Sequence, residues 1–112
     1  MVFYTDRFIP EIFGGYTVGP IILIRPKYIG DRGLLEHEKV HVRQFFSPRW
    51  WFKSKLEWEI EAYREQAKWY PDDRIPLFAT FIATKYGLSI SAVEAERSLR
   101  AGGPISPLPS RT

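Results

Sequence analysis

Residues 37–41 read His-Glu-Lys-Val-His, a spacing that suits metal chemistry. In an α-helix, residues four apart lie on one face about one turn apart, so the imidazoles of His37 and His41 can bind the same ion. Zinc binds imidazole nitrogen at about 2.0 to 2.1 Å, and a catalytic zinc site adds a third protein ligand and leaves one position for water. The pattern therefore predicts His37 and His41 as zinc ligands and Glu38 as the general base that takes a proton from the zinc-bound water.

The position of Glu38 on its helix favours the metal interpretation over an ordinary solvated helix face. At about 100° per residue, one side of the helix carries Leu34, Glu38, His41, Val42 and Phe45. This stripe is mostly apolar, so a carboxylate within it is predicted to be buried and needs a partner. An ion bound between helices would partner both the carboxylate and the imidazoles.

The third ligand is predicted to be a carboxylate or a weaker oxygen donor, because the chain has two histidines and no cysteine. The helix predicted downstream offers Glu57, Glu59, Glu61 and Glu65. Its apolar face consists of Phe52, Leu56, Ile60, Tyr63, Ala67 and Tyr70. Glu59 lies next to that face and Glu61 lies opposite it, so we expect Glu59 to be the third ligand and keep Glu61 as the alternative.

The motif followed by a glutamate on a downstream helix resembles the gluzincin metallopeptidases. Residues 59–62, Glu-Ile-Glu-Ala, are similar to the Glu-x-x-Ala pattern of the CAAX-protease-like and β-lactam-sensor-like branches, a resemblance that implies Glu59 as ligand. In those branches an acidic residue follows the alanine, whereas Tyr63 stands there in this chain. The spacing in thermolysin-like enzymes implies Glu61 instead, with Glu65 in the position of their aspartate. The two alignments conflict.

The size of the chain is similar to that of the minigluzincins, soluble zymogens that contain little beyond the catalytic core. This resemblance implies a minimal zincin-like domain, an edge strand at Tyr16–Arg25 that pairs with an extended peptide substrate, and possible latency imposed by a terminal segment. Many zincins also use an additional side chain to stabilise the oxyanion. The candidates for that role are Arg43, Tyr63, Tyr70 and Tyr86.

The elements that must position these residues are predicted from patterns of apolar, capping and breaking residues. Met1–Tyr4 and Tyr16–Arg25 are predicted strands, the second an edge or bulged strand because it contains Gly19 and Pro20. Asp31 is expected to cap a helix that begins near Gly33 and ends at about Phe46.

Three further helices are predicted. The second starts between Arg49 and Lys53 and continues to Tyr70, before Pro71. Asp72 or Asp73 caps a third that reaches Tyr86, and Ser91 with Glu94 forms the capping box of a fourth. The predicted fold class is α+β, with a domain at residues 1–100 and a Pro/Gly-rich tail at residues 101–112.

Composition limits the other possibilities. A chain of 112 residues, 45% of them hydrophobic, can close one core. The net charge of +3 is spread along the sequence and predicts no dedicated nucleic-acid binding. The rival hypothesis interprets Trp50 and Trp51, which lie among basic residues, as a stacking-and-phosphate patch. Without a third histidine or a cysteine, the chain lacks the ligands of the three-histidine hydrolases and ribonucleases and of the deformylases.

No apolar run approaches the roughly 20 residues of a membrane helix, and the N-terminus lacks the order of a signal peptide. We therefore expect a cytoplasmic protein with no transmembrane segment. The function predicted from the sequence is zinc-dependent hydrolysis of a peptide or protein substrate. The alternative is a non-catalytic metal-binding or interaction domain that keeps the zincin fold. The oligomeric state is left open.

Overall fold

The computed structural model describes residues 1–48 and 53–101 of the chain. This part of the protein consists of a three-stranded sheet and four α-helices. The predicted α+β class is therefore confirmed. The Trp50–Trp51 pair and the tail from residue 102 onward lie outside the described residues, and so do the predictions made for them.

The sheet contains β1 (Val2–Tyr4), β2 (Gly15–Val18) and β3 (Ile21–Ile24) in the order β1-β3-β2. β1 runs parallel to β3, and β2 runs antiparallel to it. The prediction of one strand over Tyr16–Arg25 is wrong. Gly19 adopts a φ of +57°, which reverses the chain, and Pro20 follows it without an N–H to donate. The segment is thus a hairpin in which β2 is an edge and β3 is the centre.

α1 (Arg32–Phe46) and α2 (Lys55–Ala67) carry the candidate metal ligands. Asp31 caps α1 as predicted, since its Oδ1 accepts a hydrogen bond from the Leu34 amide at 3.0 Å. α2 begins after Ser54, which forms a capping box with Glu57. These caps determine where the two helices begin.

α2 ends three residues before the Tyr70 that the sequence predicted. The amides of Lys68 and Trp69 bond carbonyls three residues back, which tightens the last turn. Pro71 also disfavours helical backbone at the residue before it. The sequence predicts helix as far as Tyr70 because Pro71 follows and the segment is rich in helix-forming residues.

α3 (Ile75–Lys85) and α4 (Ala92–Ala101) complete the helical layer. The Asp73 carboxylate accepts from the Ile75 amide at 3.1 Å, and Gly87 follows α3 with a φ of +66°. The predicted box at α4 is present, with Ser91 and Glu94 exchanging two hydrogen bonds of 3.1 Å. Ala101 belongs to this helix and not to the tail.

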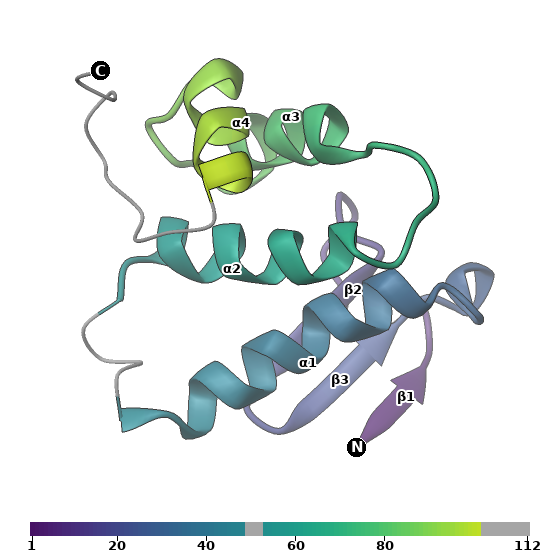
Figure 1. Cartoon of the computed structure of the whole chain (residues 1–112). Coiled ribbons are helices and arrows are strands. Elements are labelled where there is room, and N and C mark those ends of the chain that lie inside the picture. The colour runs from purple at the N-terminus through teal and green to yellow at the C-terminus, as the bar shows by residue number, and fades with distance from the viewer. Residues whose placement is uncertain (49–52, 102–112) are drawn as a thin grey trace.

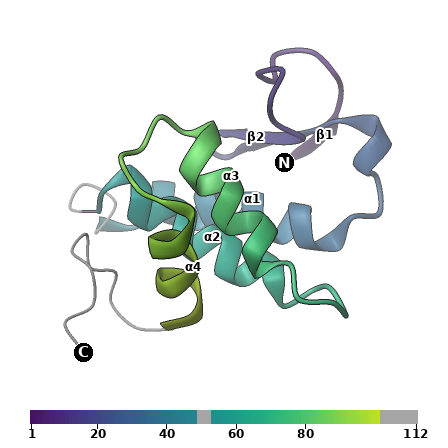
Figure 2. The same ribbon diagram turned by 90° about the horizontal axis from the view of Figure 1, so that it is seen from above.

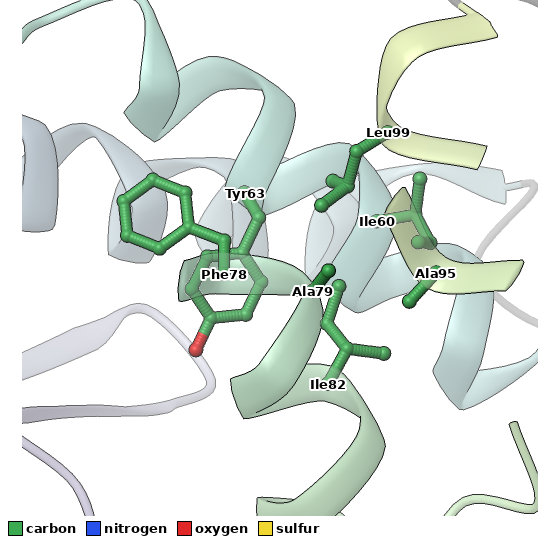
Figure 3. Close-up of a cluster of buried hydrophobic side chains, with 7 residues drawn as sticks. All are labelled: Ile60, Tyr63, Phe78, Ala79, Ile82, Ala95 and Leu99. Atoms are coloured by element: carbon green, nitrogen blue, oxygen red, sulfur yellow. The ribbon is translucent and has the colours of Figure 1, made fainter. Parts of the chain in front are cut away.

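The elements form layers that leave α1 between the sheet and α2 (Figure 1). α3 and α4 lie side by side over α2, as the view from above shows (Figure 2). The main apolar core joins α2, α3 and α4 (Figure 3). Its buried members are Ile60, Tyr63, Phe78, Ala79, Ile82, Ala95 and Leu99. α1 therefore contacts a sheet on one side and the glutamate-bearing helix on the other.

Candidate metal centre

His37, Glu38 and His41 lie on the part of α1 that is enclosed between the sheet and α2. His37 is 3% exposed and Glu38 is 4% exposed. Their ligand atoms and that of His41 lie within 4.8 Å of one another. The predicted burial of Glu38 is confirmed. The inclusion of Phe45 in the same buried face of the helix is wrong, because Phe45 is 45% exposed. α1 buries a broad arc centred on His37, Val40 and Gln44 because it has neighbours on both sides.

Glu59 on α2 reaches both imidazoles. Its Oε1 lies 3.5 Å from His37 Nε2, and its Oε2 lies 3.3 Å from His41 Nε2. The two Nε2 atoms are themselves 3.3 Å apart. Glu59 is 7% exposed, which agrees with its place beside the apolar face of α2. Three potential ligands from two helices thus converge on one point.

The spacing of these atoms fits a zinc ion. Ligand atoms at about 2.0 to 2.1 Å from a tetrahedral zinc are roughly 3.3 to 3.4 Å from one another. The two Nε2 atoms are 3.3 Å apart, and the two Glu59 oxygens lie 3.5 and 3.3 Å from one imidazole each, so these distances are close to that range. Glu59 Oε1 is also buried without a hydrogen-bond partner among the described residues. Such an atom is costly unless an ion or a water satisfies it.

Glu61, the alternative third ligand, is directed away from this point. Its carboxylate accepts hydrogen bonds from Lys53 and, at 3.1 Å, from Gln44. These bonds outweigh the effect of burial, which alone would raise the pKa of Glu61, and hold that pKa below its usual value. The structure therefore brings Glu59 to the imidazoles and leaves Glu61 paired elsewhere.

The electrostatics of the metal-free centre tie His41 and Glu59 together. Burial disfavours the charged form of each group, but their mutual attraction outweighs it. The pKa of His41 is raised to about 9, mainly by hydrogen bonding to Glu59 and by its charge. The pKa of Glu59 is lowered to about 2 by His37 and His41. The centre thus holds a negative carboxylate and protons that a cation would displace.

Glu38 is held against strand β2 and does not join the three converging ligands as closely. Its Oε1 accepts a hydrogen bond of 2.7 Å from the Thr17 hydroxyl, and its Oε2 lies 3.9 Å from His37 Nε2. A Cβ on Gly15 would stand 3.1 Å from that Oε2, so glycine leaves the carboxylate its space. Glu38, the candidate base, therefore lies next to the place where His37, His41 and Glu59 converge, but it is held by Thr17 and not by these residues.

A cleft of about 350 Å³ opens over these groups. Its lining includes Gly15, Thr17 and Gly19 from the hairpin, Trp58 and Glu59 from α2, and Tyr86. A second cavity of about 230 Å³ shares His37, Glu38 and Tyr86 with the first. The candidate centre thus borders two cavities.

The structure separates the four candidates for an oxyanion donor. Tyr86 lines the larger cleft, and its hydroxyl lies 2.6 Å from that of Tyr63. Burial raises the pKa of both phenols, so both stay neutral donors at pH 7. Tyr70 donates instead to Asp31 Oδ1 at 2.6 Å. Arg43 lines a different cavity, together with Glu61.

Two polar residues near the centre were missed by sequence reasoning. The sequence pattern places Thr17 in a strand and assigns no role to Gln44. Gln44 lies three residues after His41 on the same helix, close enough for their side chains to meet. Because a histidine ligand usually donates its second ring N–H to a nearby acceptor, this spacing is a signal in the sequence for Gln44. Thr17 offered no comparable signal, because its contact with Glu38 joins two elements.

No helix among the described residues is long and apolar enough to cross a membrane. Comparison of the chain with protein-family models, with curated proteins and with solved structures gave no match.

Proposed function

We propose that this protein is a zinc-dependent peptidase of the gluzincin type, with a minimal zincin-like fold. His37, His41 and Glu59 would hold the ion. The observation that supports the proposal is the convergence of three side chains from two helices: the two imidazole Nε2 atoms lie 3.3 Å apart, and the Glu59 carboxylate places one oxygen 3.5 Å from His37 and the other 3.3 Å from His41, distances close to those between ligands of a tetrahedral zinc.

The remaining residues support hydrolysis rather than a closed structural site. A zinc ion in this position would acidify a water molecule and polarise a carbonyl group. Glu38 is not needed as a ligand, because His37, His41 and Glu59 supply three. It lies beside them, where it can accept a proton and later deliver it to the leaving amine. The neutral Tyr86 hydroxyl in the cleft is a donor for the developing oxyanion.

A peptide is the substrate class that the surroundings favour. Among the described residues, β2 pairs with β3 alone, and β2 residues line the cleft. Its other edge can form main-chain hydrogen bonds with an extended peptide. Both cavities are lined by His37 and Glu38, and they offer space for side chains of a bound peptide.

The competing interpretation is a domain that binds metal without turnover, or that holds only a buried His41–Glu59 ion pair. Zinc content distinguishes these cases. Protein purified without added metal is analysed by elemental analysis for wild type, His41→Ala, Glu59→Ala and Glu61→Ala. We expect one zinc per chain, lost in His41→Ala and Glu59→Ala and retained in Glu61→Ala. A wild type that stays free of zinc even when zinc is offered contradicts the proposal.

Activity is then measured with a mixture of internally quenched peptides, on the full chain and on a chain that lacks residues 102–112. Glu38→Gln is the matched control, because it keeps the size of the side chain and removes the base. It should retain zinc and lose hydrolysis by about 10²- to 10⁴-fold. Zinc binding without peptide cleavage in any form of the wild type would favour the non-catalytic metal-binding domain.

A further inference from the structure

Gln44 connects the two helices that carry the candidate ligands. It lies on α1 and is 6% exposed. Its Oε1 lies 2.8 Å from His41 Nδ1. Its Nε2 donates to the Trp58 carbonyl oxygen and to Glu61 Oε1, each at 3.1 Å. Trp58 directly precedes Glu59, so the amide spans from one ligand to the backbone beside another.

The partners of this amide determine its orientation. A carbonyl and a carboxylate can only accept hydrogen bonds here, so both hydrogens of the Gln44 amino group are directed to α2. The amide oxygen must then face His41, and it can only accept. His41 therefore carries a hydrogen on Nδ1, which leaves Nε2 as the nitrogen available for a metal. That nitrogen is the one that faces His37 and Glu59.

Glu61 strengthens this arrangement from outside. It is held by Lys53 on one oxygen and accepts from Gln44 on the other. A charged acceptor polarises the Gln44 amide in the direction that makes its oxygen a better acceptor for His41. The second ring nitrogen of His37 has no such support, because its Nδ1 is buried without a hydrogen-bond partner within residues 1–48 and 53–101.

We propose that Gln44 is a positioning residue of the metal centre, which sets the tautomer and orientation of His41, and that Glu61 influences metal binding only through Gln44. This inference rests on the proposed zinc site and adds a role that the zincin resemblance did not supply. It also explains why a glutamate outside the ligand set lies so close to the centre.

Zinc affinity is the measurement that tests the role of Gln44. It is determined by competition with a fluorescent zinc chelator, on chain stripped of metal and for variants whose metal-free melting temperature is recorded. Gln44→Met keeps the length and burial of the side chain but removes its polar atoms. We expect it to weaken zinc binding about 10- to 100-fold. Glu65→Ala is the matched control on α2, since Glu65 bonds Lys68 and Trp69 and should leave zinc affinity unchanged.

A double-mutant cycle tests the route from Glu61. Glu61→Ala alone should weaken zinc binding severalfold, and it should have no further effect in the Gln44→Met background. Additive losses would show that Glu61 acts independently, as a ligand or through its charge alone, and would overturn that part of the inference.

The exchange Gln44→Glu with Glu61→Gln serves as the rescue. It places the carboxylate next to His41 and the amide on α2, so the hydrogen bond to His41 Nδ1 and the bond between the two side chains are retained, whereas the bond to the Trp58 carbonyl oxygen is lost. Zinc affinity should rise above that of Gln44→Met although the bond to Trp58 is lost, which a purely structural role would not predict. This variant also decides the matter if Gln44→Met fails to fold.

The outcomes for the two proposals are distinguishable. A wild type that binds zinc, with Gln44→Met binding equally well, overturns the inference and leaves the proposed function in place. A wild type that binds no zinc overturns the proposed function, and the inference with it. Cobalt(II) substitution adds an independent readout, because a freed His41 ring should alter the visible absorption of the bound ion in Gln44→Met.

Discussion

At the scale of single residues, the centre is a set of buried polar groups that satisfy one another incompletely. His37, Glu38 and Glu59 are each less than a tenth exposed, and a buried carboxylate needs strong partners to remain charged. Glu38 has Thr17, whereas Glu59 has the two imidazoles. The difference in partners suits one carboxylate for proton transfer and the other for binding an ion.

The Thr17 hydroxyl is predicted to orient the base. Thr17→Val removes the hydrogen bond to Glu38 Oε1 and preserves the shape of the side chain. Because a misplaced catalytic group loses up to about 10²-fold in rate, we expect kcat to fall roughly 10- to 100-fold with KM and zinc content unchanged. Steady-state kinetics on a peptide that the wild type cleaves provide the test. Thr17→Ser should retain most activity, and equal loss in both variants would contradict the prediction.

The pKa values of His41 and Glu59 predict how the stability of the metal-free protein depends on pH. The pKa of His41 is raised from 6.5 to about 9, so its contribution is complete below pH 6.5 and is lost as pH rises through 9. The pKa of Glu59 is lowered from 4.5 to about 2, so its contribution is present above pH 4.5 and is lost as pH falls toward 2. The pair therefore stabilises the fold most between these limits, at about pH 4.5 to 6.5.

Urea denaturation in the presence of a chelator measures this effect. From pH 6 to 9.5 we expect the free energy of unfolding to fall by roughly 1 to 3 kcal/mol, since each unit of pKa shift corresponds to about 1.4 kcal/mol. His41→Gln isolates the contribution, because other groups titrate equally in both proteins. An identical decline in His41→Gln would show that the ion pair is not its source.

At the scale of elements, the site depends on the close approach of α1 to the end of α2. The Asp31 carboxylate, which caps α1, also accepts a hydrogen bond from the Tyr70 hydroxyl. It therefore joins the start of α1 to the segment that follows α2. Gly33 permits this contact, because a Cβ there would stand 2.6 Å from Tyr70 Oη. The glycine is needed for packing rather than for backbone freedom.

Gly33→Ala is accordingly predicted to destabilise the protein, although alanine is the better helix former. Propensity favours the substitution by about 0.5 to 1 kcal/mol. Overpacking typically costs about 1 to 3 kcal/mol, and the Tyr70–Asp31 bond would be disturbed as well. We expect a net loss of about 1 to 2 kcal/mol in chemical denaturation. In a Tyr70→Leu background the same substitution should become neutral or stabilising, and an unchanged cost there would place its cause elsewhere.

At the scale of the whole molecule, the proposed ion would join the sheet-side helix to the helical core. α1 packs against β2 and β3, whereas α2 contributes Ile60 and Tyr63 to the core with α3 and α4. An ion held by His37, His41 and Glu59 adds a link between these two parts. Zinc binding should therefore contribute directly to global stability.

The predicted gain follows from mass action, at about 2.7 kcal/mol when free zinc is 100-fold above its dissociation constant. Thermal unfolding with added zinc and after chelation provides the measurement. The melting temperature should rise with zinc in the wild type and in Glu38→Gln, which keeps the three ligands. It should not respond in Glu59→Ala, and a response there would mean that zinc binds at another place.

Features within one turn of helix were predictable from the sequence. The spacing of His37 and His41, the Asp31 cap and the box at Ser91 each depend on residues that are three or four apart, and helical geometry fixes such neighbours. The burial of Glu59 was also predictable, since periodicity assigns residues to faces. The sequence by itself thus determined an amphipathic pair of helices with two imidazoles and two buried glutamates, Glu38 and Glu59.

Contacts between elements were decided by the tertiary structure. The hairpin at Gly19, the Thr17–Glu38 bond and the distances from Glu59 to both imidazoles depend on how the sheet, α1 and α2 pack. Gln44 became significant only when α2 supplied acceptors for its amide hydrogens. The physical reason is that periodicity specifies which face of an element is buried, but only packing against a partner brings particular atoms of two faces to within 3 or 4 Å of each other.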